Sequence, residues 1–180
     1  MGDIATQTNQ FLAFRLGNSH FAVDISQVRE VLDFQKVTQV PKTPDFLLGV
    51  INLRGNVISV VDLRLNLGMP GTEQTVNTCI LIVELQVGGD TLQIGALADA
   101  VEEVIEISPE QISPPPRAGV ELNTKFIKGM AKRSDELLII LDIDHVLTTE
   151  EIDIVETATS IIPPDAGVKN QPESITESSI

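Results

Sequence analysis

The sequence predicts an all-β protein made of two related units, each with five short strands. Three observations carry this prediction. Apolar, β-branched runs recur at short spacing, turn residues separate them, and the pattern of the first half returns in the second. Hydrophobic residues make up 42% of the 180-residue chain and charged residues 21%, close to the globular average. The chain is therefore apolar enough to bury a core.

The first half contains five apolar runs separated by turn residues. Gly17 and Asn18 lie between the first two runs, and residues 54–56 (Arg-Gly-Asn) lie between the last two, as expected where strands reverse direction. We therefore expect strands at 11–16, 20–25, 29–34, 49–53 and 57–63.

The second half shows the same organisation. Turns are expected at 88–90, where two glycines precede an aspartate, and at Ser134 and Asp135. We expect strands at 79–87, 91–98, 102–107, 127–132 and 136–142. The equal number of strands in the two halves indicates an internal repeat.

A direct comparison of the halves supports this repeat. One alignment places 28–32 on 101–105, with matching apolar, polar and Glu positions. A second alignment, at a larger offset, places Phe46 on Phe126, Gly49 on Gly129 and Asp62 on Asp142. The larger offset implies extra residues in the second copy, which we place within 113–124.

Each unit is small for a hydrophobic core of its own, so we expect the two to pack on each other around a shared core. Short strands with Gly and Pro in the connections favour small barrels, because closure removes exposed sheet edges. We place the two barrel subdomains at approximately 9–64 and 79–142, with a link at 65–78.

The ends of the chain lack this pattern. We expect 1–8 to be a flexible N-terminus and 156–180 to be a disordered tail, because the tail has too few apolar residues to order itself. Apolar Ile143, Val146 and Leu147 predict a short closing helix near 143–154. One domain is therefore expected over 9–155.

Composition excludes several classes of function. The chain has 12 Lys and Arg against 26 Asp and Glu, and its net charge of −14 would repel nucleic acid and anionic membrane surfaces. It has no Tyr or Trp for stacking on bases. Its single cysteine, Cys79, cannot form an intramolecular disulfide, which fits a reducing, cytoplasmic location.

Candidate catalytic groups are few. Asp142, Asp144 and His145 are residue types that ligate a divalent cation, so a metal-dependent hydrolase is one alternative. On a strand, however, the two aspartates would face away from His145, and a strand end with a helix cap is the simpler interpretation. Glu102, Glu103 and Glu106 are interpreted as the solvated face of a strand. Phosphate-binding glycine loops are absent. We expect no enzyme activity, metal or cofactor.

A binding protein fits these observations better, and Arg54 is the best candidate anchor. A tight turn held by Gly55 would project its guanidinium toward the carboxylates or carbonyls of a partner. The alternatives are a solvated turn arginine or an internal ion pair with Asp62 or another nearby acid.

The runs described above resemble the chemotaxis coupling protein family, CheW. The resemblance covers roughly 9–153, and its most specific block is Gly-Val-Ile-Asn-Leu-Arg-Gly at 49–55. It implies two SH3-like five-stranded barrels around a shared core and a cytoplasmic scaffold without enzyme activity. That scaffold would join the tips of chemoreceptors to the regulatory domain of the histidine kinase CheA within a membrane-associated receptor array. A related pathway, such as pilus motility, is the alternative.

The resemblance also implies two sets of partner-binding residues. A groove for the receptor would involve Ile25, Val28, Glu30, Val31, Leu97 and Val101. The signature turn matches Asn52, Arg54 and Gly55, with Gly49 before it. The resemblance does not say which of these residues contact the receptor and which contact the kinase. For each aliphatic residue, the alternative is simple packing in the core. Glu30 and Arg54 pairing with each other is a further possibility.

One position departs from the family. Ser59 stands where the family usually has proline in the strand after the Arg-Gly turn. Serine restores a backbone N–H donor, which changes the pairing that this strand can make.

Overall fold

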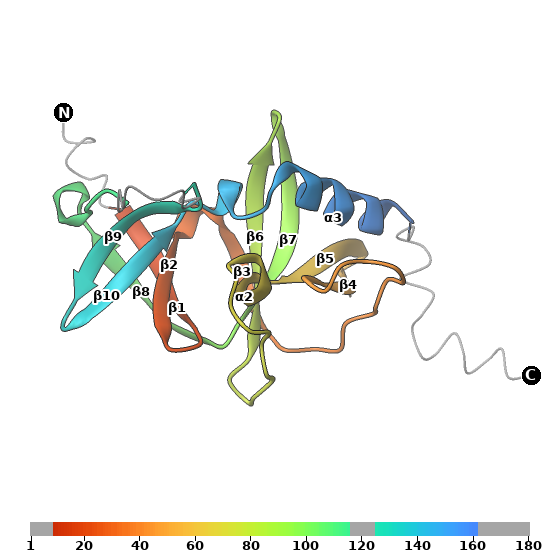
Figure 1. The fold of residues 1–180 in the computed structure, drawn as a ribbon, viewed down its shortest axis with the longest axis horizontal. Coiled ribbons are helices and arrows are strands. Elements are labelled where there is room, and N and C mark those ends of the chain that lie inside the picture. Colours follow the sequence, from red (N-terminus) through yellow and green to blue (C-terminus); the bar gives the residue numbers. More distant parts are fainter. Residues whose placement is uncertain (1–8, 116–124, 162–180) are drawn as a thin grey trace, which may run out of the picture.

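The computed structural model describes residues 9–115 and 125–161, which form two five-stranded β-sheets with a few short helices (Figure 1). The strands of the first half are β1 (Asn9–Leu16), β2 (Ser19–Asp24), β3 (Val28–Asp33), β4 (Leu47–Leu53) and β5 (Asn56–Asp62). Those of the second half are β6 (Cys79–Val87), β7 (Asp90–Ala98), β8 (Ala100–Ile107), β9 (Ile127–Arg133) and β10 (Glu136–Leu141). The all-β prediction is confirmed, with every expected strand present near its expected position.

Each sheet combines strands from both halves of the chain. Sheet A has the order β8-β1-β2-β10-β9, and sheet B has the order β3-β6-β7-β5-β4. The expected division into subdomains at 9–64 and 79–142 is therefore corrected, because neither range contains a complete sheet. The two copies of the repeat are alike, so the first hairpin of each copy completes the sheet of the other, as in domain swapping.

The strand register follows the repeat. In sheet A, β2 runs parallel to β10 with Phe21 opposite Ile139. In sheet B, β7 runs parallel to β5 with Ile94 opposite Ser59. The smaller offset of the sequence comparison relates Phe21 to Ile94, and the larger one relates Ser59 to Ile139. The strand pairs of the two sheets are therefore equivalent, as that comparison predicts.

The repeat also extends to the backbone hydrogen bonds at the strand ends. The Asp62 N–H donates to the Phe46 carbonyl (2.8 Å), and the Asp142 N–H donates to the Phe126 carbonyl (2.7 Å). These four residues are the ones that the larger offset aligns. The two copies therefore end their last strands in the same way.

Three hydrophobic clusters stabilise this arrangement. The largest joins the two sheets and contains the stacked rings of Phe14 and Phe21, whose centroids lie 6.0 Å apart. Two smaller clusters belong to the individual sheets, one around Phe11 and Ile140 in sheet A and one around Ile80 in sheet B. The expected shared core is therefore the cluster between the sheets.

Gly49 has a structural role in β4. It adopts a φ of +148°, and a Cβ at this position would overlap the carbonyl oxygen of Thr38. This close approach lets Thr38 and Val50 exchange two backbone hydrogen bonds of 2.9 and 2.8 Å. Only glycine leaves room for the segment beside β4, so the close packing of this segment depends on Gly49.

The helices are short, apart from the last. Asp62 caps α2 (Leu63–Asn66), and three 3₁₀ turns are η1 (Ile25–Gln27), η2 (Pro109–Gln111) and η3 (Ile143–His145). The closing helix expected near 143–154 consists of η3 followed by α3 (Thr149–Ile161), which lies along sheet B in Figure 1.

Helix α3 extends into the range expected to be a disordered tail, so the start of that tail at 156 is corrected. Thr148 and Glu151 form a reciprocal capping box, with hydrogen bonds of 2.9 and 3.1 Å. Val155 and Ala158 are buried in the core, which supplies the apolar contact that orders the helix. The expected flexible segments at 1–8 and 162–180 lie outside the described residues, as does most of the insertion within 113–124.

Ser59 fastens this helix to sheet B. Its side chain is fully buried, and its hydroxyl donates a 3.1 Å hydrogen bond to the backbone carbonyl of Val155 in α3. Proline, the usual residue of the family at this position, has no hydroxyl to make this bond.

We predict that Ser59→Ala lowers the free energy of unfolding by about 1 kcal/mol, because the buried Val155 carbonyl loses a donor. The matched control is Ser160→Ala, which removes an exposed hydroxyl that bonds only within α3. Urea unfolding of the three proteins measures both effects. Equal stability of the Ser59 variant and the control would show that this bond does not hold the helix.

Candidate partner-binding site

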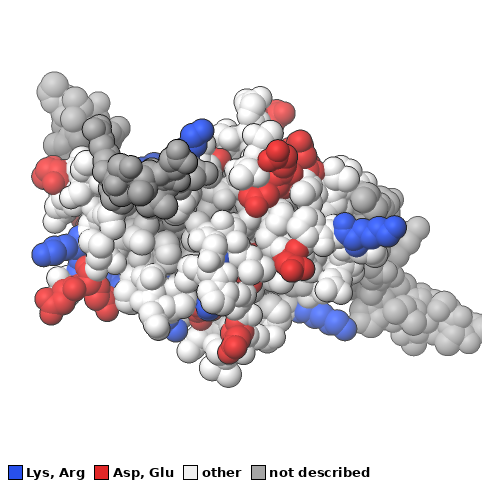
Figure 2. Space-filling model, in the orientation of Figure 1, with Lys and Arg blue, Asp and Glu red and all other residues white. Residues whose placement is uncertain are grey.

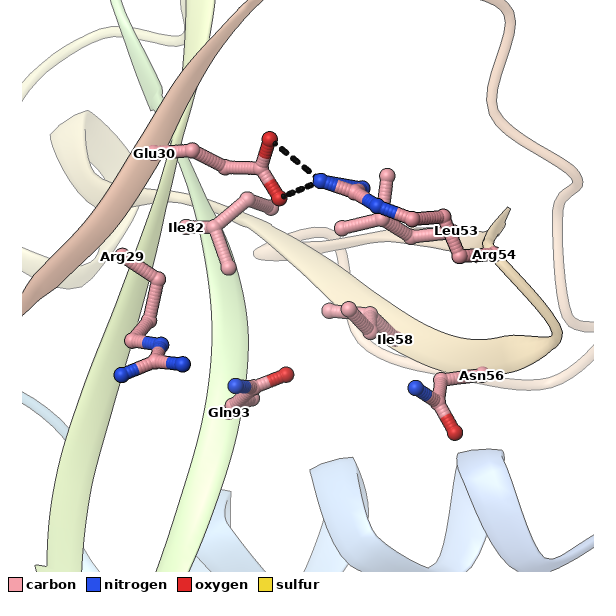
Figure 3. A pocket seen from close by; sticks show the side chains of 8 residues that line it. All are labelled: Arg29, Glu30, Leu53, Arg54, Asn56, Ile58, Ile82 and Gln93. Carbon is pink, nitrogen blue, oxygen red and sulfur yellow. Dashed lines mark hydrogen bonds and ion pairs between the residues drawn. The ribbon is translucent and has the colours of Figure 1, made fainter.

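A recess of about 310 Å³ opens on sheet B where the β4–β5 turn approaches β3 (Figure 3). Its apolar side chains come from Leu53, Ile58 and Ile82. Its polar and charged side chains are those of Arg29, Glu30, Arg54, Asn56 and Gln93. The recess thus combines a small apolar surface with charged groups, as protein-binding anchor sites do.

The β4–β5 turn positions Arg54. Arg54 and Gly55 have φ values of 52° and 88°, as in the two-residue turns that match the twist of a β-hairpin. The Asn52 side-chain oxygen accepts a 2.9 Å hydrogen bond from the Gly55 N–H and closes the turn. The Asn-Leu-Arg-Gly block therefore forms a rigid turn with an arginine at its tip.

The arginine contacts Glu30 across the recess. Arg54 Nη2 lies 2.8 Å from one Glu30 carboxylate oxygen and 2.6 Å from the other, while 65% of the Arg54 side chain stays exposed. Of the alternatives that the sequence left open, the structure shows the pair with Glu30. Asp62 instead accepts hydrogen bonds from Arg64 and Thr72. The internal pair orients a guanidinium that solvent still reaches.

The aliphatic residues expected to line a groove divide into two groups. Ile25, Val28 and Val101 are partly buried against the core between the sheets, and Val31 is 43% exposed. Leu97 is only 4% exposed and packs in the sheet B cluster, so it is a core residue. Val31 is therefore the groove candidate most accessible to a partner.

Sequence reasoning missed some members of this surface. Arg29, Asn56 and Gln93 line the recess but belong to no motif. Val104 is 50% exposed and is the repeat counterpart of Val31. The alignment of 28–32 with 101–105 was the signal that identifies Val104, whereas the recess residues become neighbours only through the pairing of β3 with β6 and β6 with β7.

The structure separates the residues of the proposed metal site. Asp142 bonds His145 at 2.9 Å, whereas Asp144 accepts hydrogen bonds from the Gln27 side chain (3.0 Å) and the Gln86 N–H (2.9 Å). Asp144 thus links η3 to Gln86, in the part of β6 that extends past its pairing with β3. Within 9–115 and 125–161, no group of three or more His, Cys, Asp or Glu side chains is arranged to hold a metal ion.

The equivalent place in sheet A contains an ionic cluster. The repeat relates Glu102 to Arg29, His20 to Gln93, Glu136 to Asn56 and Arg133 to Leu53. Arg133 Nη2 lies 2.6 Å from Glu102 and 3.3 Å from Glu136, and His20 Nδ1 lies 3.0 Å from Glu102. The expectation that Glu102 is simply a solvated residue is corrected, because only 22% of its side chain is exposed. We call His20, Glu102, Arg133 and Glu136 the sheet A cluster.

Among the described residues, three ionisable groups have clearly shifted pKa values. Burial raises the pKa of Glu102, but the hydrogen bond and charge of Arg133, with the contribution of His20, outweigh it and leave the pKa below its ordinary value. The hydrogen bond to Glu102 raises the pKa of Arg133. Burial raises the pKa of the Cys79 thiol, which disfavours the reactive thiolate.

The Glu102 shift predicts an acid-dependent stability. A carboxyl whose pKa falls on folding stabilises the protein above its unfolded pKa, about 4.3, and this contribution is lost as pH falls through the lower folded value. We expect Glu102→Gln to cost about 1 kcal/mol at pH 7 and less at pH 3. Denaturation at both pH values tests this, with exposed Glu106→Gln on the same strand as control. An equal cost at both pH values would contradict it.

The charged surface is mixed. In the view of Figure 2, acidic and basic side chains lie in small groups separated by uncharged surface, and no large basic area is present on the described part of this face. Among the described residues, no helix is long and apolar enough to span a membrane.

Comparisons with known proteins agree with this architecture. The family model for the CheW-like domain matches residues 10–151. Chemotaxis protein CheW of Klebsiella aerogenes is 34% identical over 151 residues, which cover 84% of this chain and 89% of that protein. Protein FrzA of Myxococcus xanthus is 29% identical over 147 residues, covering 81% and 89%. The crystal structure of the scaffolding protein TtCheW from Thermoanaerobacter tengcongensis superposes with a TM-score of 0.71 at 33% identity, covering 81% and 96%.

Two interlocked sheets with a charged surface recess define a β protein suited to presenting binding surfaces. The chain belongs to the CheW-like family, because the family model spans most of its length and relatives match it over most of theirs.

Proposed function

We propose that this protein is a non-catalytic coupling protein of chemotaxis signal transduction, a scaffold that joins chemoreceptors to the histidine kinase CheA. The observation that carries the proposal is the match to the CheW-like domain over residues 10–151, together with relatives named as chemotaxis and scaffolding proteins. The protein would work in the cytoplasm and reach membrane receptor arrays only through its partners.

We assign the partner-binding surface to the sheet B recess and the adjoining face of β3. Arg54 and Arg29 have side chains that are 65% and 58% exposed, and both are oriented by ion pairs, with Glu30 at 2.6 Å and Glu84 at 3.3 Å. Exposed Val31 is opposite Leu81, so it lies on the other face of β3, toward the groove between the sheets. Arginines that ion pairs already orient lose little conformational entropy on binding, which suits them as anchors.

Internal packing supports a role as a rigid connector. The two sheets share one core, so a partner held on sheet B and another held in the groove between the sheets would be fixed relative to each other. A scaffold needs this property, whereas catalysis would need converging reactive groups. The titratable residues described above are engaged in structural pairs.

The direct experiment is calorimetric titration of the full chain with the regulatory domain of the CheA homologue from the same cell, and separately with a helical hairpin from a receptor tip. Saturable one-to-one binding to both is the expected result. Binding only to the kinase of another chemosensory system, such as one for pilus motility, would assign the chain to that system. No binding to any of these would contradict the coupling role.

We predict that Arg54→Ala weakens binding of at least one partner by about tenfold, or roughly 1.4 kcal/mol, because truncating an arginine anchor typically costs more than 1 kcal/mol. Its effect on folding stability should be small, since the Glu30 pair is largely exposed. Lys128→Ala, an exposed cation on β9 of sheet A, serves as the control.

Glu30→Gln tests whether Arg54 binds a partner while Glu30 orients it, or whether the two residues form only a structural pair. If Glu30 only orients the arginine, Glu30→Gln weakens binding in the wild type but has no further effect in the Arg54→Ala background. Affinity for both partners that is unchanged in Arg54→Ala would make the pair purely structural.

A further inference from the structure

We infer that the sheet A cluster is a proton switch, in which protonation of His20 exchanges one of its hydrogen-bond partners at the end of sheet A. The cluster lies at the place that the repeat makes equivalent to the sheet B recess. It joins β2, β8, β9 and β10, which are four of the five strands of sheet A. The inference does not depend on the proposed coupling function.

Both nitrogens of the His20 ring face charged groups. Nδ1 lies 3.0 Å from Glu102 Oε2 and 3.3 Å from Arg133 Nη2. Nε2 lies 3.2 Å from Glu136 Oε2. The ring is 19% exposed, so these side chains, more than water, determine its hydrogen bonds. One ring nitrogen therefore has an acceptor and a donor within reach at the same time.

This geometry admits two hydrogen-bonding states. In the imidazolium, both nitrogens donate, Nδ1 to Glu102 and Nε2 to Glu136. In the neutral ring with its proton on Nε2, the bond from Nε2 to Glu136 remains, while Nδ1 accepts a hydrogen bond from Arg133 Nη2. The two N–H groups of Nη2 then donate to Glu102 and Nδ1, and its longer bond to Glu136 is given up. Loss of the proton thus moves Nδ1 from the carboxylate to the guanidinium.

Arg133 makes the second state possible. Without it, a deprotonated Nδ1 would direct its lone pair at the Glu102 carboxylate. Arg133 holds Glu102 at 2.6 Å in either state, so it stays in place to donate to Nδ1. Two further charged residues are near: Glu103 on β8 lies 3.7 Å from Arg133, and Arg15 is the cross-strand partner of His20 on β1. Charged residues of β1, β8, β9 and β10 are therefore close to the ring.

The repeat limits the switch to one end of the molecule. The counterpart of His20 in sheet B is Gln93, which does not titrate, and the counterpart of Arg133 is Leu53. Protonation of His20 therefore changes the charge at this end of sheet A by one, while the equivalent place in sheet B has no group to take up a proton.

Nuclear magnetic resonance of the ¹⁵N-labelled full chain tests the switch, because ring ¹⁵N shifts identify which nitrogen carries the proton. We expect the neutral form of His20, at the high-pH end of the titration, to be protonated on Nε2 and the low-pH form to be protonated on both nitrogens. His145, the other histidine of the chain, is the internal control, and His20→Gln assigns the signals. A neutral His20 that carries its proton on Nδ1 in the wild type would overturn the inference without any variant.

Two substitutions test the part played by Arg133. Arg133→Leu, which introduces the residue that sheet B has at the equivalent position, should move the proton of neutral His20 to Nδ1, where it can bond Glu102. Arg133→Lys retains a donor and should preserve the Nε2 form. The same form in Arg133→Leu as in the wild type would overturn the role of Arg133.

Discussion

Four strand pairs hold the molecule together, because each joins one half of the chain to the other. The antiparallel ladders β1–β8 and β3–β6 and the parallel ladders β2–β10 and β5–β7 complete sheets that neither half contains alone. Arg64 and Asp99 reinforce this link, with an ion pair of 2.9 Å in which both side chains are largely buried. Asp99 also accepts a hydrogen bond from the Gly17 N–H in the β1–β2 turn. Separating the halves would therefore break both sheets and the core between them.

The repeat makes the differences between the two sheets informative. In both sheets, an arginine at or beside a hairpin turn contacts a glutamate on the neighbouring edge strand, Arg54 with Glu30 and Arg133 with Glu102. The first arginine is 65% exposed, and the second is 20% exposed and surrounded by further acids. Equivalent hairpins thus border an open recess in sheet B and a filled end in sheet A, although the two arginines occupy adjacent rather than identical positions of the repeat. The two similar surfaces differ through a few residues.

Much of this fold was accessible from the sequence. Local alternation and turn residues determine the strands, and the two offsets of the repeat correctly match Phe21 with Ile94 and Ile139 with Ser59. The exchange of hairpins was not accessible, because similar copies make pairing within a half and pairing between halves look the same in sequence. The end of α3 was missed because its stability comes from burial of Val155 and Ala158, which local composition does not show. Arg54 was found through its turn, whereas Arg29 and Gln93 reach the recess only through strand pairing.

The interlocked architecture also bears on how a scaffold of this kind transmits a change between partners. Core residues from both sheets pack in one cluster, and densely packed interiors shift between discrete arrangements more readily than they deform gradually. A displacement of β3 at the recess acts directly on β6, its neighbour in sheet B, and β6 packs in that cluster with β1 of sheet A. Two separate barrels on a linker would lack this route. Exchanged hairpins therefore give this small protein a mechanical connection between its two surfaces.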